Sequence, residues 1–126
     1  MNIAEYQKKA YTAIQIHEDK KDAILNWAVG LSEESGEVLG LIKHQMWAGE
    51  NPSKEEYAKE IGDVLWYLSA LCTELDIDFE TVASMNLYKL KRRYGDHFDA
   101  SQSLERHEIE KKMSQDEVYK CLARHL

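Results

Sequence analysis

Gly30-Leu31-Ser32-Glu33-Glu34-Ser35-Gly36-Glu37-Val38-Leu39 is the stretch around which the chain is organised. Within it, Glu34 and Glu37 stand at i and i+3, a spacing that places two side chains on one face of an α-helix. Downstream, Glu60-Ile61-Gly62-Asp63 repeats that spacing. Both acidic pairs lie among aliphatic residues typical of a helix core, where a carboxylate is costly unless a positive charge meets it. The two stretches therefore predict packed helices that carry an acidic site.

Length and composition indicate one domain. The chain has 126 residues, of which 44% are hydrophobic and 31% charged, with a formal net charge of -7. The lack of a basic stripe argues against a nucleic-acid polymer as partner, although a nucleotide can still be held through metal ions. No apolar run approaches the roughly 18 residues of a membrane span, and the N-terminus does not resemble a signal peptide. We therefore expect a cytoplasmic protein with no membrane partner.

Helical patterns and capping residues run through almost the whole sequence. Asp22, Ser53 and Asp78 are the predicted N-caps of the second, third and fourth helices, and Ser114 begins a capping box for a short terminal one. The predicted helices cover about residues 3–17, 23–47, 54–75, 79–93 and 115–122. No segment alternates with the period of a strand. The predicted fold is all-α, a four-helix bundle with a short C-terminal helical appendage.

The two acidic pairs are expected to meet if the second and third helices pack antiparallel. At about 1.5 Å per residue, the pairs lie roughly 18 Å and roughly 12 Å from the turn between the helices, a mismatch of about one helical turn. Four residues after each acid no basic residue stands, and only Lys59 offers a partner, to Asp63. A metal site and a solvated acidic face both remain as explanations of this pattern.

Oxygen ligands alone would favour Mg²⁺ or Mn²⁺ over zinc. The two cysteines, Cys72 and Cys121, lie far apart, and Cys72 in its apolar run is predicted to be a small core residue. A di-iron bundle requires Glu-x-x-His, and no histidine here follows a glutamate by three residues. The sequence also has no glycine-rich phosphate loop, so phosphate binding would depend on the metal.

Further candidate residues lie near the acids and on the fourth helix. Asn86, Lys89 and Arg93 share one helical face and suit phosphate oxygens, although basic residues in a last turn also suit the helix dipole. Lys43 and Trp47, beyond Glu37 on the second helix, are candidate substrate contacts. An aromatic ring there either stacks on a base or packs in the core or an interface.

Gly36 and Gly62 each lie between the acids of a pair, where a glycine costs about 1 kcal/mol of helix stability relative to alanine. Close helix packing and room around bound ligands both explain them. Trp27, Trp66 and Tyr67 are candidates for the core or a subunit interface, and for base stacking.

At these residues the sequence resembles the MazG-like, all-α nucleoside triphosphate pyrophosphohydrolases. Their hallmark is Glu-x-x-Glu on one helix and Glu-x-x-Asp on the next, here Glu34 to Glu37 and Glu60 to Asp63. Asn86-x-x-Lys89-Leu90-x-x-Arg93-Tyr94 extends the likeness, which covers about residues 25–106. We therefore expect a MazG-like domain over residues 1–106 and a helical tail over residues 107–126 that has no counterpart in the family.

The resemblance implies Mg²⁺-dependent cleavage, with Mn²⁺ as a substitute, of a (d)NTP between its α and β phosphates. The products are a (d)NMP and pyrophosphate, and the role is house-cleaning or control of nucleotide pools. A dedicated dUTP/dCTP hydrolase on the same scaffold is one alternative. A non-catalytic nucleotide-binding or regulatory module is another.

The resemblance also implies roles for individual residues. The implied metal ligands are Glu34, Glu37, Glu60 and Asp63. Glu33, or one of the ligating glutamates, would orient or deprotonate the attacking water. Asn86, Lys89 and Arg93 would contact phosphate or sugar. Family members assemble as dimers or tetramers, so a homodimer or homotetramer is expected to complete the bundle.

Overall fold

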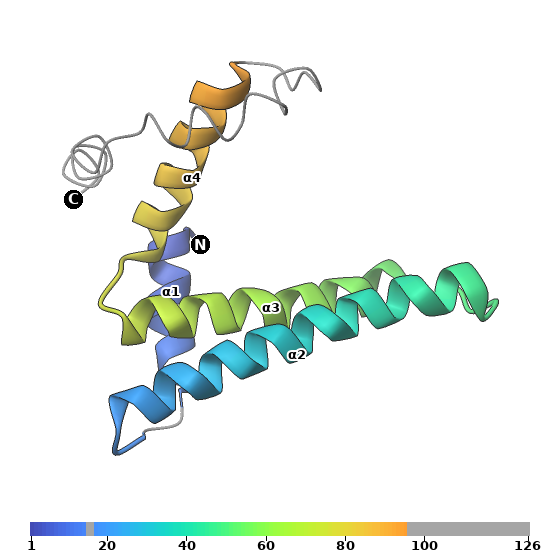
Figure 1. The fold of residues 1–126 in the computed structure, drawn as a ribbon, viewed down its shortest axis with the longest axis horizontal. Helices are drawn as coiled ribbons and strands as arrows, with labels where there is room; N and C mark the ends of the chain where they lie inside the picture. The colour runs from blue at the N-terminus through green and yellow to red at the C-terminus, as the bar shows by residue number, and fades with distance from the viewer. Residues whose placement is uncertain (15–16, 96–126) are drawn as a thin grey trace. The chain divides into compact units, whose positions relative to one another are not determined.

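The computed structural model describes residues 1–14 and 17–95, shown in Figure 1. In these residues the chain forms four α-helices and no strand: α1 (Ile3–Tyr11), α2 (Lys20–Trp47), α3 (Lys54–Glu74) and α4 (Phe79–Tyr94). The all-α prediction is confirmed. The predicted terminal helix, Cys121 and the expected boundary between residues 106 and 107 lie outside the described residues. No described helix is long and apolar enough to cross a membrane.

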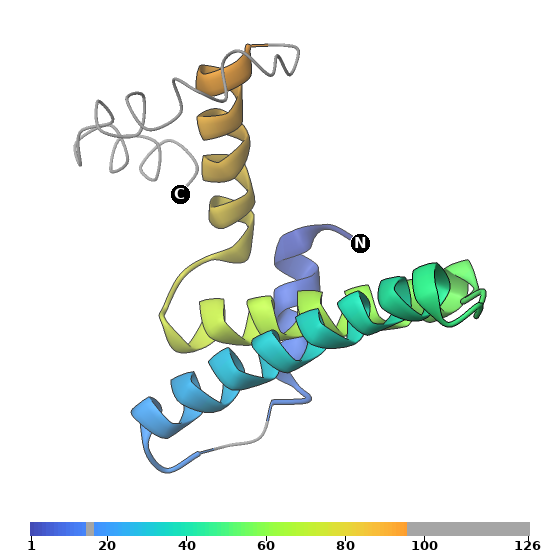
Figure 2. The ribbon, with the colours of Figure 1, turned by 45° about the vertical axis from the view of Figure 1, so that its right-hand side comes forward.

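The chain divides into two compact units, Met1–Ile77 and Asp78–Leu126. The first unit contains α1, α2 and α3, and α4 belongs to the second. In the first unit α2 and α3 lie side by side and antiparallel, as Figures 1 and 2 both show, and α1 packs across α3. The predicted antiparallel pairing of the two acidic helices is therefore present.

Local sequence fixes the turn between α2 and α3. Gly49 adopts a positive φ of 71°, a conformation that costs glycine little. The predicted capping box at Ser53 is present: Ser53 Oγ accepts from the Glu56 backbone N–H at 3.2 Å, and Glu56 Oε2 accepts from the Ser53 N–H at 2.7 Å. These bonds satisfy backbone donors that the first turn of a helix would otherwise leave unpaired.

The core of the first unit is an aromatic cluster between α2 and α3. Trp27, 3% exposed, packs with Ala23 and Ala70, and its ring meets that of Trp66 edge-on with centroids 5.5 Å apart. Burying a large aromatic ring supplies much of the apolar contact in a domain of this size. Trp27 is therefore a core residue, and Cys72 is buried as predicted.

Glycine allows the helices to approach at Gly30, where a Cβ atom would overlap the ring of Tyr67. At Gly36 and Gly62 a Cβ would meet no atom within 4 Å among the described residues. Packing within one subunit therefore requires glycine at Gly30 and does not explain Gly36 or Gly62.

The first helix is shorter than predicted, because it ends at Tyr11 and not near residue 17. Thr12 Oγ1 donates to the Lys9 carbonyl at 2.7 Å, and the N–H groups of Ala13 and Ile14 bond to carbonyls three residues back. Such side-chain bonds and tight turns compete with the continuing α-helix.

The start of α2 also differs from the prediction. Asp19 is the N-cap: its backbone is extended, and its Oδ1 accepts from the Lys21 N–H at 2.8 Å. Asp22 lies inside the first turn, where its charge suits the helix dipole. Asp78 does cap α4 as predicted, accepting from the Thr81 N–H at 2.9 Å.

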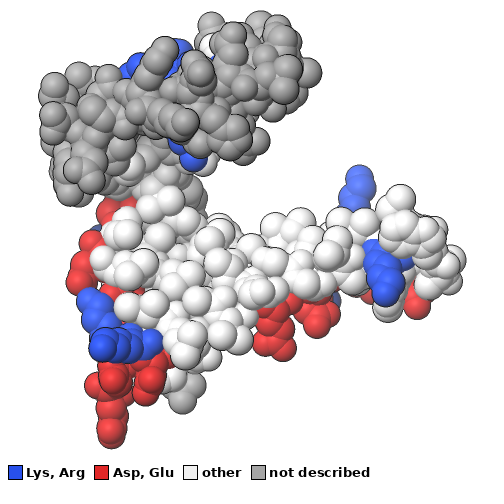
Figure 3. Space-filling view, viewed as in Figure 1, with Lys and Arg blue, Asp and Glu red and all other residues white. Residues whose placement is uncertain are grey.

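Charge is unevenly spread over the hairpin that α2 and α3 form. In Figure 3 its Lys and Arg side chains lie toward the two ends, acidic side chains gather at the left-hand end and along the lower edge, and much of the remaining surface is uncharged. Exposed apolar side chains of α2 include Leu25, Val29, Leu39 and Met46. By helical register Leu25 and Val29 lie opposite Trp27 on α2, whereas Leu39 and Met46 lie about 120° and about 100° from it around the helix axis.

Candidate metal centre

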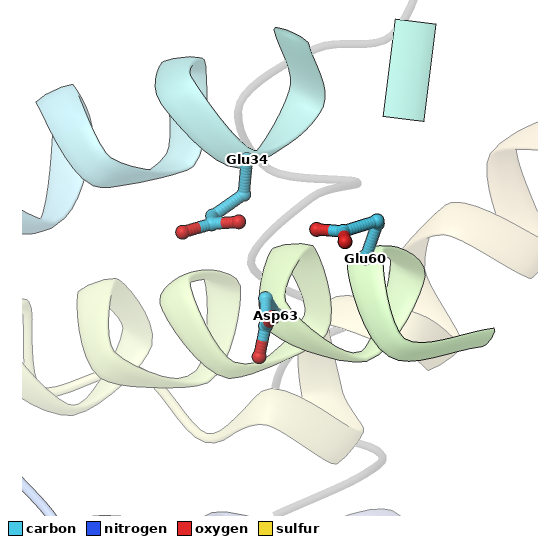
Figure 4. A group of neighbouring side chains, drawn as sticks. All are labelled: Glu34, Glu60 and Asp63. Atoms are coloured by element: carbon cyan, nitrogen blue, oxygen red, sulfur yellow. The ribbon is translucent and has the colours of Figure 1, made fainter. Parts of the chain in front are cut away.

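Three carboxylates meet midway along the hairpin. Glu34 of α2 and Glu60 and Asp63 of α3 each offer an oxygen atom, and these atoms all lie within 4.8 Å of one another. Figure 4 shows Glu34 and Glu60 extending toward each other from the two helices, with Asp63 one turn further along α3. Glu34 and Glu60 are half-buried and Asp63 is exposed. The site is thus accessible on one side.

Helical register explains why these acids meet. Glu34 follows Trp27 and Gly30 at i+7 and i+4, so it extends the row of α2 that packs on α3. Asp63 stands one turn before Tyr67, whose ring covers Gly30. The acids therefore occupy the next turns of the same helical faces that build the aromatic core.

Electrostatics at this cluster disfavour negative charge. Partial burial raises the pKa of Glu34 above its ordinary value, and the charges of Asp63, Glu33, Glu60 and Glu37 raise it further, in that order. No ion pair in the described part of the chain involves Glu34, Glu60 or Asp63. A cation placed among the three carboxylates would relieve this repulsion.

Lys59, the one basic residue expected to pair with Asp63, lies elsewhere. Its Nζ is 3.7 Å from Glu55 Oε1, one turn earlier on α3, in an exposed pair. Such a pair contributes little to stability. Asp63 is therefore left without a basic partner in the described residues.

The other acids of the predicted site lie beside this cluster. Glu33 and Glu37 are exposed on α2, and neither belongs to the group of three, although the charges of both act on Glu34. Three of the four predicted ligands are therefore together in the structure. Ligation by Glu37 and base catalysis by Glu33 stay predictions.

The predicted substrate contacts are placed as follows. Lys43 and Trp47 lie in the last two turns of α2, and Trp47 is 76% exposed, so its ring is not part of the core. Asn86, Lys89 and Arg93 lie on α4, in the second unit, and Arg93 is buried there. Their roles toward substrate stay predictions.

Tyr6 of α1 is a residue that the sequence did not single out as part of the site. It is half-buried, and its pKa is raised, first by that burial and then by the charge of Asp63. The feature of the sequence that could have indicated Tyr6 is its phenol on the apolar face of α1, between Ile3 and Ala10. Spacing alone did not connect that face with Asp63.

The donor set fits a hard divalent cation. Three carboxylates and no thiolate or imidazole form an all-oxygen environment, which Mg²⁺ and Mn²⁺ prefer. The half-buried Glu34, with a raised pKa and no basic partner in the described residues, is the feature that such a cation would stabilise. The arrangement suits an ion that also binds phosphate oxygens.

Comparison with known proteins agrees with this chemistry: the chain belongs to the MazG nucleotide pyrophosphohydrolase domain family, whose model matches residues 23–98. The matched segment includes all three clustered acids and excludes α1. The Gene 37 protein of Mycobacterium phage L5 is 32% identical over 69 residues, which cover 52% of this chain and 60% of the phage protein. The chain thus spans less than two thirds of that relative.

A second relative has a name that states an activity. The phosphoribosyl-ATP pyrophosphatase of Leptospira biflexa is 34% identical over 79 residues, which cover 63% of this chain and 74% of the relative. No solved structure gave a significant match.

Proposed function

We propose that this protein is a Mg²⁺-dependent nucleoside triphosphate pyrophosphohydrolase that converts a (d)NTP to the (d)NMP and pyrophosphate. The observation that carries the proposal is the cluster of Glu34, Glu60 and Asp63, with carboxylate oxygens within 4.8 Å and no basic partner in the described residues. Membership of the MazG family supports the nucleotide substrate and the hydrolysis.

Glu34, Glu60 and Asp63 would hold the ion, and Glu37, one turn after Glu34, would complete the set from α2 by a change of rotamer. Mg²⁺, or Mn²⁺ in its place, supplies neutralisation of the phosphate charge and a more acidic bound water. Exposure of Asp63 leaves one side of the cluster open to a phosphate chain.

The protein's own groups then act on the water and the substrate. Glu33, exposed beside the cluster, orients a water and accepts its proton. The water oxygen bonds to one phosphorus of the α–β anhydride, and the bond from that phosphorus to the bridging oxygen breaks with its electron pair. The basic residues of α4, Lys89 and Arg93, and the amide of Asn86 would hold phosphate or sugar oxygens. Lys43 and Trp47 are further substrate contacts in this proposal.

A second substrate is favoured by the Leptospira biflexa relative, whose name specifies phosphoribosyl-ATP. That compound contains the same α–β anhydride, so the same carboxylates would serve it. A dedicated dUTP/dCTP hydrolase would also cleave this anhydride, but only in those two nucleotides. A non-catalytic nucleotide-binding module would leave every nucleotide intact. These functions therefore differ in which nucleotide the protein consumes.

We also propose that the chain assembles as a homodimer or homotetramer. The part of α2 that faces away from Trp27 exposes Leu25, Val29, Leu39 and Met46, and Leu39 is 65% exposed. A second copy that packs there would remove apolar surface from water at about 25 cal/mol per Å². Gly36 lies on the same side with open space around it, which would let another helix approach closely.

The decisive experiment incubates the protein and Mg²⁺ with each common NTP and dNTP and with phosphoribosyl-ATP, and assays pyrophosphate and orthophosphate separately. We expect pyrophosphate with a matching yield of monophosphate. Orthophosphate alone would exclude cleavage of the α–β anhydride. Binding without turnover of any nucleotide would favour the non-catalytic module.

Matched variants test the site in the same assay. Glu34→Gln, Glu60→Gln and Asp63→Asn each remove one charge at nearly constant volume. Each should reduce kcat by at least about 100-fold, because losing even an outer-shell partner of a metal ligand costs about 10–100-fold. Glu55→Gln is the control, because Glu55 lies on α3 outside the cluster and pairs only with Lys59 in the described residues. Activity of all three variants equal to that of the control would refute the metal assignment.

A further inference from the structure

The first helix lies outside residues 23–98, which the family model matches, yet one of its side chains bonds to the segment from which α4 begins. We call this segment the junction; it comprises residues 75–78, between the end of α3 and the first residue of α4. Ile77 is the last residue of the first unit, and Asp78 is the first residue of the second. The junction therefore joins the hairpin that carries the clustered acids to the helix that carries the predicted phosphate or sugar contacts.

The backbone of the junction forms a Schellman motif. Asp76 has a φ of 55°, the left-handed conformation in which many helices end. The Ile77 N–H donates to the Cys72 carbonyl at 2.8 Å and the Asp76 N–H donates to the Thr73 carbonyl at 3.2 Å, which are the two bonds of this motif. Asp78 follows directly as the N-cap of α4. Rotation about the Ile77 backbone thus changes the direction in which the chain enters α4.

A side chain of α1 bonds to Ile77. The Gln7 side-chain amide donates to the Ile77 carbonyl at 3.0 Å and to Thr73 Oγ1 at 3.2 Å. An amide has two N–H donors, so Gln7 makes both bonds at once. Lys20 also pairs with Asp76 at 3.0 Å, but both side chains are exposed and such a pair adds little. Ile77 is therefore held on both sides, with its N–H bonded to α3 and its carbonyl bonded to α1.

We propose that Gln7 is a positioning residue for the substrate, because its bond to the Ile77 carbonyl holds the junction in one conformation and so places the substrate contacts of α4. The inference rests on the proposed function, since it assumes that α4 contacts the nucleotide. A hydrogen bond biases the junction only by its own net free energy, and apparent affinity falls with the fraction of binding-competent molecules. Gln7 thus acts on substrate binding and leaves the metal site unchanged, since the three clustered carboxylates lie on α2 and α3.

Two matched substitutions separate the two bonds of Gln7. Gln7→Met keeps the length of the side chain and removes its donors. Thr73→Val keeps the shape of the threonine, removes its bond to Gln7, and retains the bond from Gln7 to the Ile77 carbonyl. We expect Gln7→Met to raise KM for the nucleotide about 2- to 10-fold at nearly unchanged kcat, the factor that one neutral hydrogen bond provides. Thr73→Val should keep the KM of the unaltered protein.

The melting temperature and Mn²⁺ binding distinguish positioning from a structural role. Both variants lose a bond between α1 and α3, so both should melt at a similarly lowered temperature, and only Gln7→Met should have a raised KM. An unchanged KM for Gln7→Met, or an equal rise for both variants, would overturn the inference. Mn²⁺ binding without nucleotide, followed by electron paramagnetic resonance, should be equal in all three proteins. Weaker Mn²⁺ binding by Gln7→Met would place its effect at the metal site and refute the role toward substrate.

Hydrogen exchange measured by nuclear magnetic resonance tests the junction without any nucleotide. Loss of the carbonyl bond should speed exchange of the Ile77 N–H about 2- to 10-fold in Gln7→Met relative to Thr73→Val. Equal exchange in the two variants would show that Gln7 does not hold the junction, and the inference would fail while the proposed function stands. If the unaltered protein turns over no nucleotide, the proposed function is refuted, and the role of Gln7 toward substrate is refuted with it.

Discussion

Glu34 of α2 and Glu60 of α3 face each other across the hairpin, and each has a carboxylate oxygen within 4.8 Å of the other and of Asp63 (Figure 4). In water such a contact between like charges is unfavourable. The hairpin nevertheless holds the two helices together, because the aromatic core around Trp27 lies on the same faces of α2 and α3. The core therefore keeps the carboxylates together in spite of their repulsion, and a bound cation would reduce this repulsion.

Divalent ions should stabilise the protein. An ion that binds only the folded state adds about 2.7 kcal/mol to the free energy of unfolding at a concentration 100 times its Kd. We expect Mg²⁺ or Mn²⁺ to raise the melting temperature of the unaltered protein and of Glu55→Gln, and to leave that of Asp63→Asn nearly unchanged. Differential scanning calorimetry with and without chelator measures this, and equal shifts in all three proteins would contradict it.

Without metal, stability should depend on the ionisation of Glu34. Its pKa in the folded state lies above the ordinary 4.5, mainly through burial and then through neighbouring acids. The folded state therefore binds the proton more tightly than the unfolded chain does, and stability falls as pH rises from the ordinary value through the raised one. Urea unfolding in chelator across this range should show that fall.

Glu34→Gln is the control for the pH effect, because it cannot ionise at this position. Its free energy of unfolding should vary less with pH over the same range. With metal present the sign should reverse, since protons compete with the ion and affinity rises with pH. An identical pH dependence of the variant and the unaltered protein would show that other groups determine it.

Gly30 and Gly36 should respond oppositely to alanine. At Gly30 the new Cβ would overlap the ring of Tyr67, and overpacking of this kind costs about 1–3 kcal/mol of stability. At Gly36 the Cβ meets no atom of the described chain, so Gly36→Ala should gain up to about 1 kcal/mol from helix propensity. Chemical denaturation compares the two, and a destabilised Gly36→Ala would instead indicate contact with a second subunit.

Charge on the exposed side of α2 should disrupt assembly. Val29→Glu and Leu39→Glu place a carboxylate within the proposed subunit interface, where an unpaired charge is costly. We expect both variants to shift toward the monomer mass in light scattering coupled to size exclusion. Leu75→Glu, an exposed leucine at the end of α3, is the control. If all three proteins keep the mass of the unaltered one, this side of α2 is not the interface.

The helices and most of the acidic cluster followed from local sequence. The capping box at Ser53 and the cap at Asp78 depend on neighbouring residues, so the sequence predicts the starts of α3 and α4 correctly. At the start of α2 both Asp19 and Asp22 suit an N-cap, and the pattern alone did not favour Asp19. The end of α1 depended on a hydroxyl bond from Thr12, which a period of 3.6 residues does not reveal.

The site shows a second reason why the structure differs from what the sequence predicts. Residues three apart on a helix differ by about 60° around its axis, so Glu34 and Glu37 share a face only approximately. Because α2 packs against α3, Glu34 lies beside the acids of α3, whereas Glu37 is exposed. The effect of the Asp63 charge on the pKa of Tyr6 depends on how α1 docks on α3, which residue spacing within one helix does not predict.

The exposed tip of the hairpin has a mechanical consequence. Residues 42–51 are exposed throughout, whereas the buried aromatic core lies near the start of α2 and the end of α3. Among the described hydrogen bonds, Tyr57 Oη to Gln45 Oε1, at 2.7 Å, joins the two arms toward the tip. The Trp27 core thus holds the two helices together at one end of the hairpin, and the three carboxylates lie between this core and the tip. Spreading of the tip would therefore move Glu34 away from Glu60, so a contact that holds the tip closed would also keep these two carboxylates together.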